Sequence, residues 1–550
     1  MSFRHRTKLL PWKTDELPYF FKKKREYYPH ANGEVRKLNQ VKQKEPNIPQ
    51  RSEAPLYDGN LFQALTYLQF SLGLSSDFTM REIEIIGKKA MILFYSTICD
   101  QDKVQAMITA IHNHQYQQAA SQDLEHYLVT RVLTAPSTSH VTNMMDIRQA
   151  VASGNIVLLI DQIPKAITVF ARDVAQRSPD EPPMEASSRS AQIGFVENVF
   201  TNIGLLRLYM SNDSLLVKQF TVGVRSNTPV MVAYMKDVAQ DAVVQEIIEK
   251  IELIEMDYVD SAAAIEQRVC AHQWNLFPLA RITFRVDNVV RELNQGKVSI
   301  HVDGDPTAIL LPSTIQDFFQ TEEDYTHTAW EASFIRILRV VAMMLSIYLP
   351  ALYVALVDFN PELLPKLLGF HISSSRAGVP FSAVMEVVIM QFIIEILREA
   401  SLRIPKQMGQ TIGVVGGLVV GQAAVEAGIV SNILIIIVAL TAISVFVAPS
   451  YEFTIVTRML AWVMLFASAF MGIYGVILFS IWMLYEVGAL RLFGVAYMEP
   501  YNGAFLKDAW IDGLLRLPLK VAPRRTAHMR PEDPMGEIHP PKPNKKGQQK

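Results

Sequence analysis

Long uncharged apolar stretches lie only in the second half of this chain of 550 residues. The stretch 340–357 has eighteen residues without a charged side chain, long enough for a tilted crossing of a bilayer at ~1.5 Å of rise per residue. Nothing before residue 335 has this character. Five segments are candidates for membrane spans: 340–357, 381–397, 411–427, 433–448 and 459–485. The sequence therefore predicts an all-α polytopic membrane domain after a soluble first half.

A ladder of glycines runs through the third of these segments. Gly409, Gly413, Gly417 and Gly421 recur at every fourth position, so on a helix they form a stripe without side chains. In water each glycine costs a helix about 1 kcal/mol relative to alanine. In lipid, small residues at this spacing let two helices approach closely. We therefore predict a packing face between helices or subunits; a buried glycine-rich segment of a soluble enzyme is the alternative.

Polar side chains interrupt the segment 381–397. Glu386 lies near its middle, where an ionised carboxylate costs roughly 2.5–3.5 kcal/mol and is expected to face other helices or water. Gln391 and Glu395 are four apart and share a face, whereas Glu386 lies on the opposite face from Glu395. We expect one face to border an ion or proton route. The alternatives are an ion pair of Glu395 with Arg398 and an interhelical hydrogen bond from a protonated Glu386.

Other polar residues of this half add weaker indications. Gln422 and Glu426, four residues apart beyond the glycine ladder, are weaker candidates for the same route, and Arg458 is expected to mark a helix end. Basic residues flank the cytoplasmic ends of the first two candidate spans under the positive-inside rule: Arg336, Arg339, Arg398, Arg403 and Lys406. The basic C-terminal tail favours the same side, which requires an even number of crossings. Among four to six spans, either the glycine segment does not cross or a sixth crossing lies within 459–498.

The first half has the mixed pattern of an α/β or α+β fold. Strand-like segments come in pairs at 81–98, 155–172, 215–236 and 297–312, with helical patterns between them. A proline-rich loop at 178–183 separates the first two pairs from the last two. The sequence predicts a basic disordered arm (1–55) followed by two small cytosolic α/β subdomains (56–180 and 181–320). The membrane domain (321–500) and a cytosolic C-terminal segment with a disordered tail (501–550) come after them.

Composition and motifs exclude several function classes. The net charge of −2 gives no overall attraction to nucleic acid, and Cys99 and Cys270 supply neither a disulfide framework nor a metal cluster. The histidines are scattered, and the chain has no P-loop, nucleophile elbow or dinucleotide-binding glycine motif. The acidic run 322–324 is expected to be solvated. We therefore expect no catalytic residues, no metal and no cofactor.

The N-terminal arm offers a possible contact with lipid. It has no apolar stretch of the kind found in signal peptides, so the first half is expected to stay in the cytoplasm. Its basic cluster, 22–25, is suited to anionic lipid at about 1 kcal/mol per charge, and a solvated tail is the equal alternative.

The chain resembles the GerA family of spore germination proteins, specifically the A subunit of nutrient germinant receptors. The resemblance covers about 56–525 and is densest at "PALYVAL" (350–356), the run 395–431 and "ALTAIS" (439–444). In the first half, "VDGDP" (302–306) and "EDY" (323–325) belong to it. A spaced pattern of single residues also matches the family: Pro182, Glu185, Arg189, Gly194, Phe195, Glu197, Asn202, Arg207 and Pro312.

Three departures from the family pattern fall at 190–192, 283–287 and 492–497, which indicates a diverged paralogue whose ligand or partner contacts differ. The resemblance implies a protein of the spore inner membrane acting with a transporter-like B subunit and a lipoprotein C subunit. It also implies a receptor triggered by nutrients, with the nutrient ligand bound through the B subunit as one possibility. A subunits of this kind are expected to form homo-oligomers that conduct ions.

Three functions fit these residues. The first is a non-enzymatic, ligand-gated cation channel subunit, favoured by the pairing of the glycine ladder with Glu386, Gln391 and Glu395. The second is a secondary transporter with a broken glycine helix at its substrate site. The third is a non-conducting scaffold that docks germination partners through residues 56–320.

Overall fold

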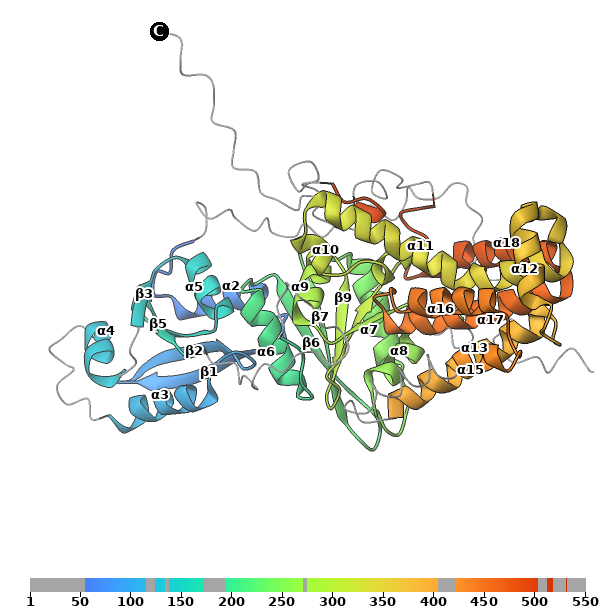
Figure 1. The fold of residues 1–550 in the computed structure, drawn as a ribbon. Coiled ribbons are helices and arrows are strands. Elements are labelled where there is room, and N and C mark those ends of the chain that lie inside the picture. The colour runs from blue at the N-terminus through green and yellow to red at the C-terminus, as the bar shows by residue number, and fades with distance from the viewer. Residues whose placement is uncertain are drawn as a thin grey trace, which may run out of the picture. The chain divides into compact units, whose positions relative to one another are not determined.

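The computed structural model describes residues 55–114, 124–133, 138–172, 193–270, 275–403, 421–502, 512–517 and 531. Two five-stranded sheets with their helices form the first half (Figure 1). Helices form the second half, followed by a small two-stranded sheet of β11 (Arg491–Leu492) and β12 (Val495–Ala496). The predicted fold class is therefore confirmed. The predicted arm at 1–55, with its basic cluster, lies outside the described residues apart from Pro55, and the predicted domain boundaries stay predictions.

The first sheet is antiparallel throughout, in the order β1-β2-β4-β5-β3. Its strands are β1 (Phe78–Ile85), β2 (Lys88–Tyr95), β3 (Thr138–Val141), β4 (Asn155–Ile160) and β5 (Ala166–Phe170). Ile86 and Gly87 join β1 to β2 with φ of 52° and 71°, the two positive values of the tight hairpin turn that suits twisted strands. Its helices are α2 (Leu61–Ser71), α3 (Gln101–Asn113), α4 (Leu124–Tyr127), which continues as a π turn, and α5 (Met144–Ala152).

The second sheet repeats this topology. Its order is β6-β7-β9-β10-β8, with β6 (Leu215–Val222), β7 (Thr228–Met235), β8 (Arg281–Thr283), β9 (Val298–Val302) and β10 (Ala308–Leu311). Its helices are α6 (Val199–Tyr209), α7 (Asp241–Glu252), α8 (Ala262–Cys270) and α9 (Val286–Asn294). In each sheet a second hairpin lies beside the first. A short strand, β3 or β8, pairs with the outer strand of the second hairpin and forms one edge of the sheet. All four predicted strand pairs are confirmed, whereas the edge strands β3 and β8 are additions.

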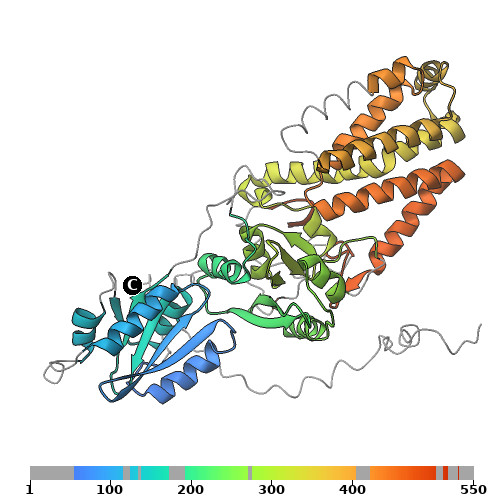
Figure 2. The same ribbon diagram turned by 90° about the horizontal axis from the view of Figure 1, so that it is seen from below.

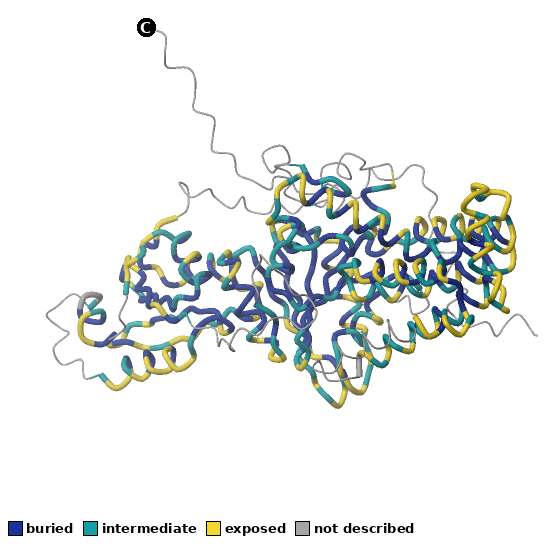
Figure 3. The backbone as a smooth tube through the Cα atoms, viewed as in Figure 1, coloured by how far each residue is buried: buried dark blue, intermediate teal, exposed yellow. Residues whose placement is uncertain are grey.

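The helical half begins with a 3₁₀ turn (Ile315–Phe318) and α10 (Glu323–Thr326). There follow α11 (Ala329–Val354), α12 (Lys366–Arg376), α13 (Ala383–Arg403), α15 (Gly421–Glu426), α16 (Asn432–Val445), α17 (Tyr451–Met471) and α18 (Ile473–Ala489). Within the part of the chain that the structure describes, two helical segments are long and apolar enough to cross a membrane, Ala329–Phe359 and Tyr451–Met471. The helices α16 and α18 are shorter and also apolar. Large apolar side chains are exposed along these helices, which indicates membrane association (Figure 3).

The candidate span 459–485 is not one helix but parts of two, α17 and α18, as the alternative of a further crossing within 459–498 requires. The number of crossings stays a prediction. The chain turns sharply at Gly472, whose φ of 60° favours glycine, and α17 and α18 meet there at one end (Figure 2). A Cβ at Gly472 would lie 2.7 Å from Cβ of Phe359, so the residue lacks room as well. Arg458 is the eighth residue of α17, and its expected place at a helix end is therefore wrong.

The glycine ladder lies mostly beyond the described residues. Gly409, Gly413 and Gly417 fall in the gap between 403 and 421. Gly421 begins α15, and a Cβ built there meets no described heavy atom within 4 Å. The predicted packing face stays a prediction.

Candidate functional site

A small polar cavity lies among α11, α13, α16 and α17. Its volume is about 20 Å³, enough for roughly one water molecule. Gln391 and Glu395 of α13 both line it, as their shared face predicts. The other lining residues are Ser346, Ile394, Arg398, Val438, Thr441, Ala442, Val445, Arg458 and Ala461.

Glu395 is held by two arginines at this cavity. Its carboxylate accepts a hydrogen bond from Nη1 of Arg398 at 3.1 Å and another from Nε of Arg458 at 3.1 Å. A further contact joins Nη2 of Arg458 to its second oxygen. The arginine at position 398 is the partner considered from sequence, whereas Arg458, 63 residues away, is not a neighbour that spacing reveals. One acid beside two guanidinium groups carries a net charge of +1, which disfavours a cation in this arrangement.

Glu386 occupies a different site, at the first turn of α13. Its side chain is 0% exposed, and its carboxylate accepts from Nε of Arg376 at 3.0 Å and from the backbone N–H of Ser431 at 3.0 Å. Arg376 also contacts Asp358 at 3.3 Å, and Asp358 accepts from the N-terminal backbone N–H groups of α13. These contacts tie α12, α13 and α16 to the end of the first long helix. Glu386 and Glu395 thus belong to separate clusters, consistent with their opposite faces.

The remaining two sequence candidates lie on α15. Nε2 of Gln422 donates to Oε1 of Glu426 at 3.2 Å, and both side chains are exposed. Neither lines the polar cavity described above.

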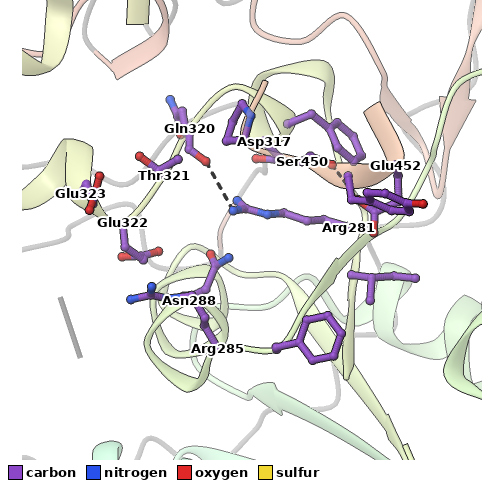
Figure 4. Close-up of a pocket in the computed structure, with 15 residues that line it drawn as sticks. Arg281, Arg285, Asn288, Asp317, Gln320, Thr321, Glu322, Glu323, Ser450 and Glu452 are labelled. Atoms are coloured by element: carbon purple, nitrogen blue, oxygen red, sulfur yellow. Dashed lines mark hydrogen bonds between the residues drawn. The ribbon is translucent and has the colours of Figure 1, made fainter. Parts of the chain in front are cut away.

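A larger cleft, which the sequence did not reveal, has a volume of about 430 Å³ (Figure 4). It is bounded by β8 and the start of α9, by the segment 317–323 and by residues 449–452 before and at the start of α17. The lining residues are Arg281, Ile282, Phe284, Arg285, Asn288, Asp317, Phe318, Gln320, Thr321, Glu322, Glu323, Pro449, Ser450, Tyr451 and Glu452.

The acidic run 322–324 beside this cleft was expected to be solvated, and for Asp324 this expectation is wrong. Asp324 is fully buried, and its carboxylate lies 3.2 Å from Nε of Arg336 and 2.8 Å from Nη1 of Arg339. Burial alone would raise the pKa of Asp324, but the hydrogen bonds and charges of these arginines, with a backbone N–H of Thr321, lower it. Nη1 of Arg336 also reaches Asp512 at 3.0 Å. Both arginines, the eighth and eleventh residues of α11, are therefore engaged in buried ion pairs, and their predicted place at a cytoplasmic helix end stays a prediction.

Comparison with known proteins identifies the relatives of this fold. The family model described as "Bacillus/Clostridium GerA spore germination protein" matches residues 66–528. The chain belongs to the GerA family. It is 34% identical to Spore germination protein GerLA of Bacillus cereus over 479 residues, which cover 86% of this chain and 97% of that one. Spore germination protein B1 of Bacillus subtilis (strain 168) is 38% identical over 398 residues, or 72% and 82% of the two chains.

Another GerA relative, Spore germination protein KA of Bacillus subtilis (strain 168), is 33% identical over 492 residues, covering 88% of this chain and 89% of its own. Among solved structures, the N-terminal domain of the A subunit of the Bacillus megaterium spore germinant receptor GerK3 matches with a TM-score of 0.36 and 23% identity. That match covers 47% of this chain and 96% of the other. The resemblance noted from the sequence motifs is thus confirmed at the level of the GerA family.

Proposed function

We propose that this GerA-family chain is the membrane subunit of a spore nutrient germinant receptor and oligomerises into a ligand-gated cation channel. The observation that carries the proposal is the polar cavity with Glu395 at its wall. A carboxylate and an amide facing a water-sized space among four apolar helices are suited to an ion route. The expected partners are a transporter-like B subunit and a lipoprotein C subunit in the spore inner membrane, with the nutrient reaching the receptor through the B subunit. The sheets and the basic tail then lie on the cytoplasmic side.

The arrangement of charges fits a closed state. Arg398 and Arg458 neutralise Glu395 and leave one positive charge in excess, so a cation would be repelled. Opening then requires that Arg458 moves away from Glu395, which α17 can achieve by a shift or rotation. Glu386 serves this proposal by holding α12, α13 and α16 together through Arg376 and the Ser431 N–H. Gln422 and Glu426 are proposed as outer polar groups of the same route.

The test is monovalent cation flux through purified full-length protein in liposomes. Arg458→Gln should raise flux and Glu395→Gln should lower it, each by roughly tenfold or more. One unit charge at 4 Å is worth about 4 kcal/mol at an effective dielectric constant of 20, so even partial screening leaves such an effect. Glu399→Gln, one turn further along α13, removes the same charge from an exposed position and is the matched control. Equal flux from all four proteins would refute the role of Glu395.

The oligomer is tested separately at the glycine ladder. Gly413→Leu should reduce both the oligomer, measured by light scattering in detergent, and the flux, because four added carbon atoms prevent close helix approach. Gly488→Leu is the control, since Gly488 is exposed on α18 and a Cβ there meets no described atom within 4 Å. Oligomers that stay intact and tight to ions under every stimulus would contradict conduction. Rescue of a null mutant by the sheet-bearing half alone would favour the scaffold instead, and concentrative solute uptake by the isolated chain would favour the transporter.

A further inference from the structure

The 430 Å³ cleft is lined by Arg281, a buried side chain with one N–H donor group that has no hydrogen-bond acceptor among the described residues. Arg281, the first residue of β8, is 7% exposed, and Nη2 donates to the backbone carbonyl of Gln320 at 3.3 Å. Nη1 has no hydrogen-bond partner among the described residues, and the nearest carboxylate oxygen, Oε1 of Glu292, is 3.9 Å away. Figure 4 shows the guanidinium reaching into the space among Gln320, Thr321 and Asn288. A buried charged donor without an acceptor is costly, so this position is suited to an oxyanion.

Three acids near Arg281, Glu292, Asp317 and Glu322, are already matched to other cations, while Glu323 and Glu452 line other parts of the cleft wall. Glu292 lies 2.6 Å from Nζ of Lys297 and 2.5 Å from Nη2 of Arg291. These two contacts hold it at its long distance from Arg281. Asp317 lies 2.7 Å from the same lysine, and Glu322 lies 3.3 Å from Nε of Arg291. Neither carboxylate is positioned to supply the acceptor that Nη1 lacks.

Five apolar or aromatic residues form part of the wall beside polar ones. Ile282, Phe284, Phe318, Pro449 and Tyr451 line the cleft beside the guanidinium. A volume of about 430 Å³ lies within the roughly 300–1,000 Å³ of small-molecule sites, which combine apolar walls with a few polar groups. A planar carboxylate matches the fork of an arginine, and an attached apolar or aromatic group would contact these side chains.

We propose that this cleft binds a small organic carboxylate, whose oxygens accept from Nη1 of Arg281 and whose apolar body contacts Phe284, Phe318 and Tyr451. The site also borders the start of α17: Ser450 caps this helix, and its Oγ accepts from the N–H of Phe453. Arg458 follows two turns later on the same helix, so an occupied cleft would bias its contact with Glu395. Only this consequence for gating rests on the proposed channel function; binding itself does not.

Binding is measured by calorimetry on the purified full-length protein in detergent, with benzoate as the probe. Benzamide has nearly the same shape without the charge, and inorganic phosphate is an oxyanion without an apolar body. Benzoate should bind, and benzamide should bind roughly ten- to hundredfold more weakly, the range of a charged hydrogen bond. Phosphate should be weaker than benzoate because it leaves the apolar wall uncovered.

Variants locate the site. Arg281→Met keeps an unbranched side chain but removes the guanidinium group, and it should lose benzoate affinity by a similar roughly ten- to hundredfold factor. Tyr451→Ala, at the partly exposed edge, should weaken benzoate severalfold, whereas Tyr474→Ala on α18, outside the cleft, should not change it. If Arg281→Met does not fold, the comparison of the two tyrosine variants decides.

Three results would overturn the proposal: no heat with benzoate, equal binding of benzamide, or equal affinity in the Tyr451 and Tyr474 variants. Phosphate binding without benzoate binding would replace the carboxylate by an inorganic anion and would likewise overturn it. Because no ion flux enters this measurement, a failure here leaves the channel proposal standing, and a failure of conduction leaves this one standing.

Discussion

The buried ion pair of Asp77 and Arg207 should be a main stabilising contact between the two sheet-bearing units. Asp77 precedes β1 of the first sheet, and Arg207 lies on α6 beside the second, both essentially unexposed. Nε and Nη2 of the arginine lie 2.5 and 2.7 Å from the two carboxylate oxygens. Hydroxyl groups of Ser75 and Thr97 donate to the same oxygens at 2.6 and 2.8 Å. The Arg207 guanidinium carbon lies 3.6 Å from the ring centroid of Tyr95.

Arg207→Met retains most of the side-chain volume but leaves a buried carboxylate without its cation. Breaking such a pair from one side costs about 3–5 kcal/mol. For a folding unit of 150–250 residues this corresponds to a fall of roughly 6–20 °C in the melting temperature. Asp77→Asn should destabilise in the same way, and the double variant should lose less than the two single losses together, since no unpaired charge remains.

The assay is amide hydrogen exchange of β1 and β2 in the full-length protein, together with its thermal transition. Exchange reports the local free energy of opening of these strands. Lys218→Met on β6 is the control, because its partly exposed position predicts a change within about 0.5 kcal/mol. A loss below about 1 kcal/mol for Arg207→Met, or fully additive single losses, would refute the claim that burial makes this pair cooperative.

The same pair predicts a pH dependence of definite sign. Burial alone would raise the pKa of Asp77, but the charge and hydrogen bonds of Arg207 outweigh it and lower the pKa. A lowered folded-state pKa stabilises above the unfolded value of about 3.9 and loses that contribution as the pH falls through the folded value. The unfolded chain is the same in both proteins, so their difference in stability depends only on the two folded states. In Arg207→Met, burial without the arginine raises the pKa of Asp77. The difference should therefore shrink as the pH falls from that raised pKa to the lowered pKa of Asp77 in wild type. An unchanged difference on acidification would contradict this assignment.

Three further predictions concern other parts of the chain. Glu386→Gln should lower the free energy of unfolding of the helical half by about 1.5–3 kcal/mol, because Arg376 loses one of its two carboxylate partners and keeps Asp358. Glu362→Gln, in an exposed 3₁₀ turn, should leave it unchanged, and thermal unfolding in detergent measures both. Gly472→Ala should destabilise the α17–α18 turn by about 1–3 kcal/mol through its φ of 60° and the nearby Phe359, and Gly488→Ala should be neutral or mildly stabilising in the same assay. Burial raises the pKa of both cysteine thiols to about 12, so mass spectrometry at pH 8 should find Cys99 and Cys270 unmodified by iodoacetamide until the protein unfolds. A cysteine introduced at exposed Gln101 should react, and rapid native labelling of either natural thiol would contradict the burial.

The strands illustrate how far local pattern reaches. The four strand pairs could be predicted because each hairpin joins neighbours in the chain through a short turn. The edge strands β3 and β8 could not, since they are four and three residues long and pair with strands more than twenty residues away. The repeated strand order of the two sheets was hidden for the same reason: it resides in these remote pairings rather than in a shared sequence.

Charged residues show the other limit. Spacing correctly put Gln391 and Glu395 on one face of α13 and Glu386 on the other, because helical periodicity is local. Spacing wrongly predicted that Asp324 is solvated and that Arg458 marks a helix end. Both side chains form ion pairs with residues of other elements, which spacing does not reveal. No sequence pattern indicates that Nη1 of Arg281 lacks an acceptor. Its surroundings are set by β8, the segment 317–323 and the start of α17, which meet only in the folded chain.

The sequence by itself determined the order of a sheet-bearing half and an apolar helical half, the strand pairs and the family, because hydropathy, periodicity and motifs are properties of neighbouring residues. Only the tertiary structure showed that the helix breaks at Gly472, that Arg398 and Arg458 both contact Glu395, and that a cleft lies beside Arg281. Hydrogen bonds and ion pairs act over about 3 Å between atoms whose residues lie tens to hundreds of positions apart, and only the folded chain fixes which of them meet.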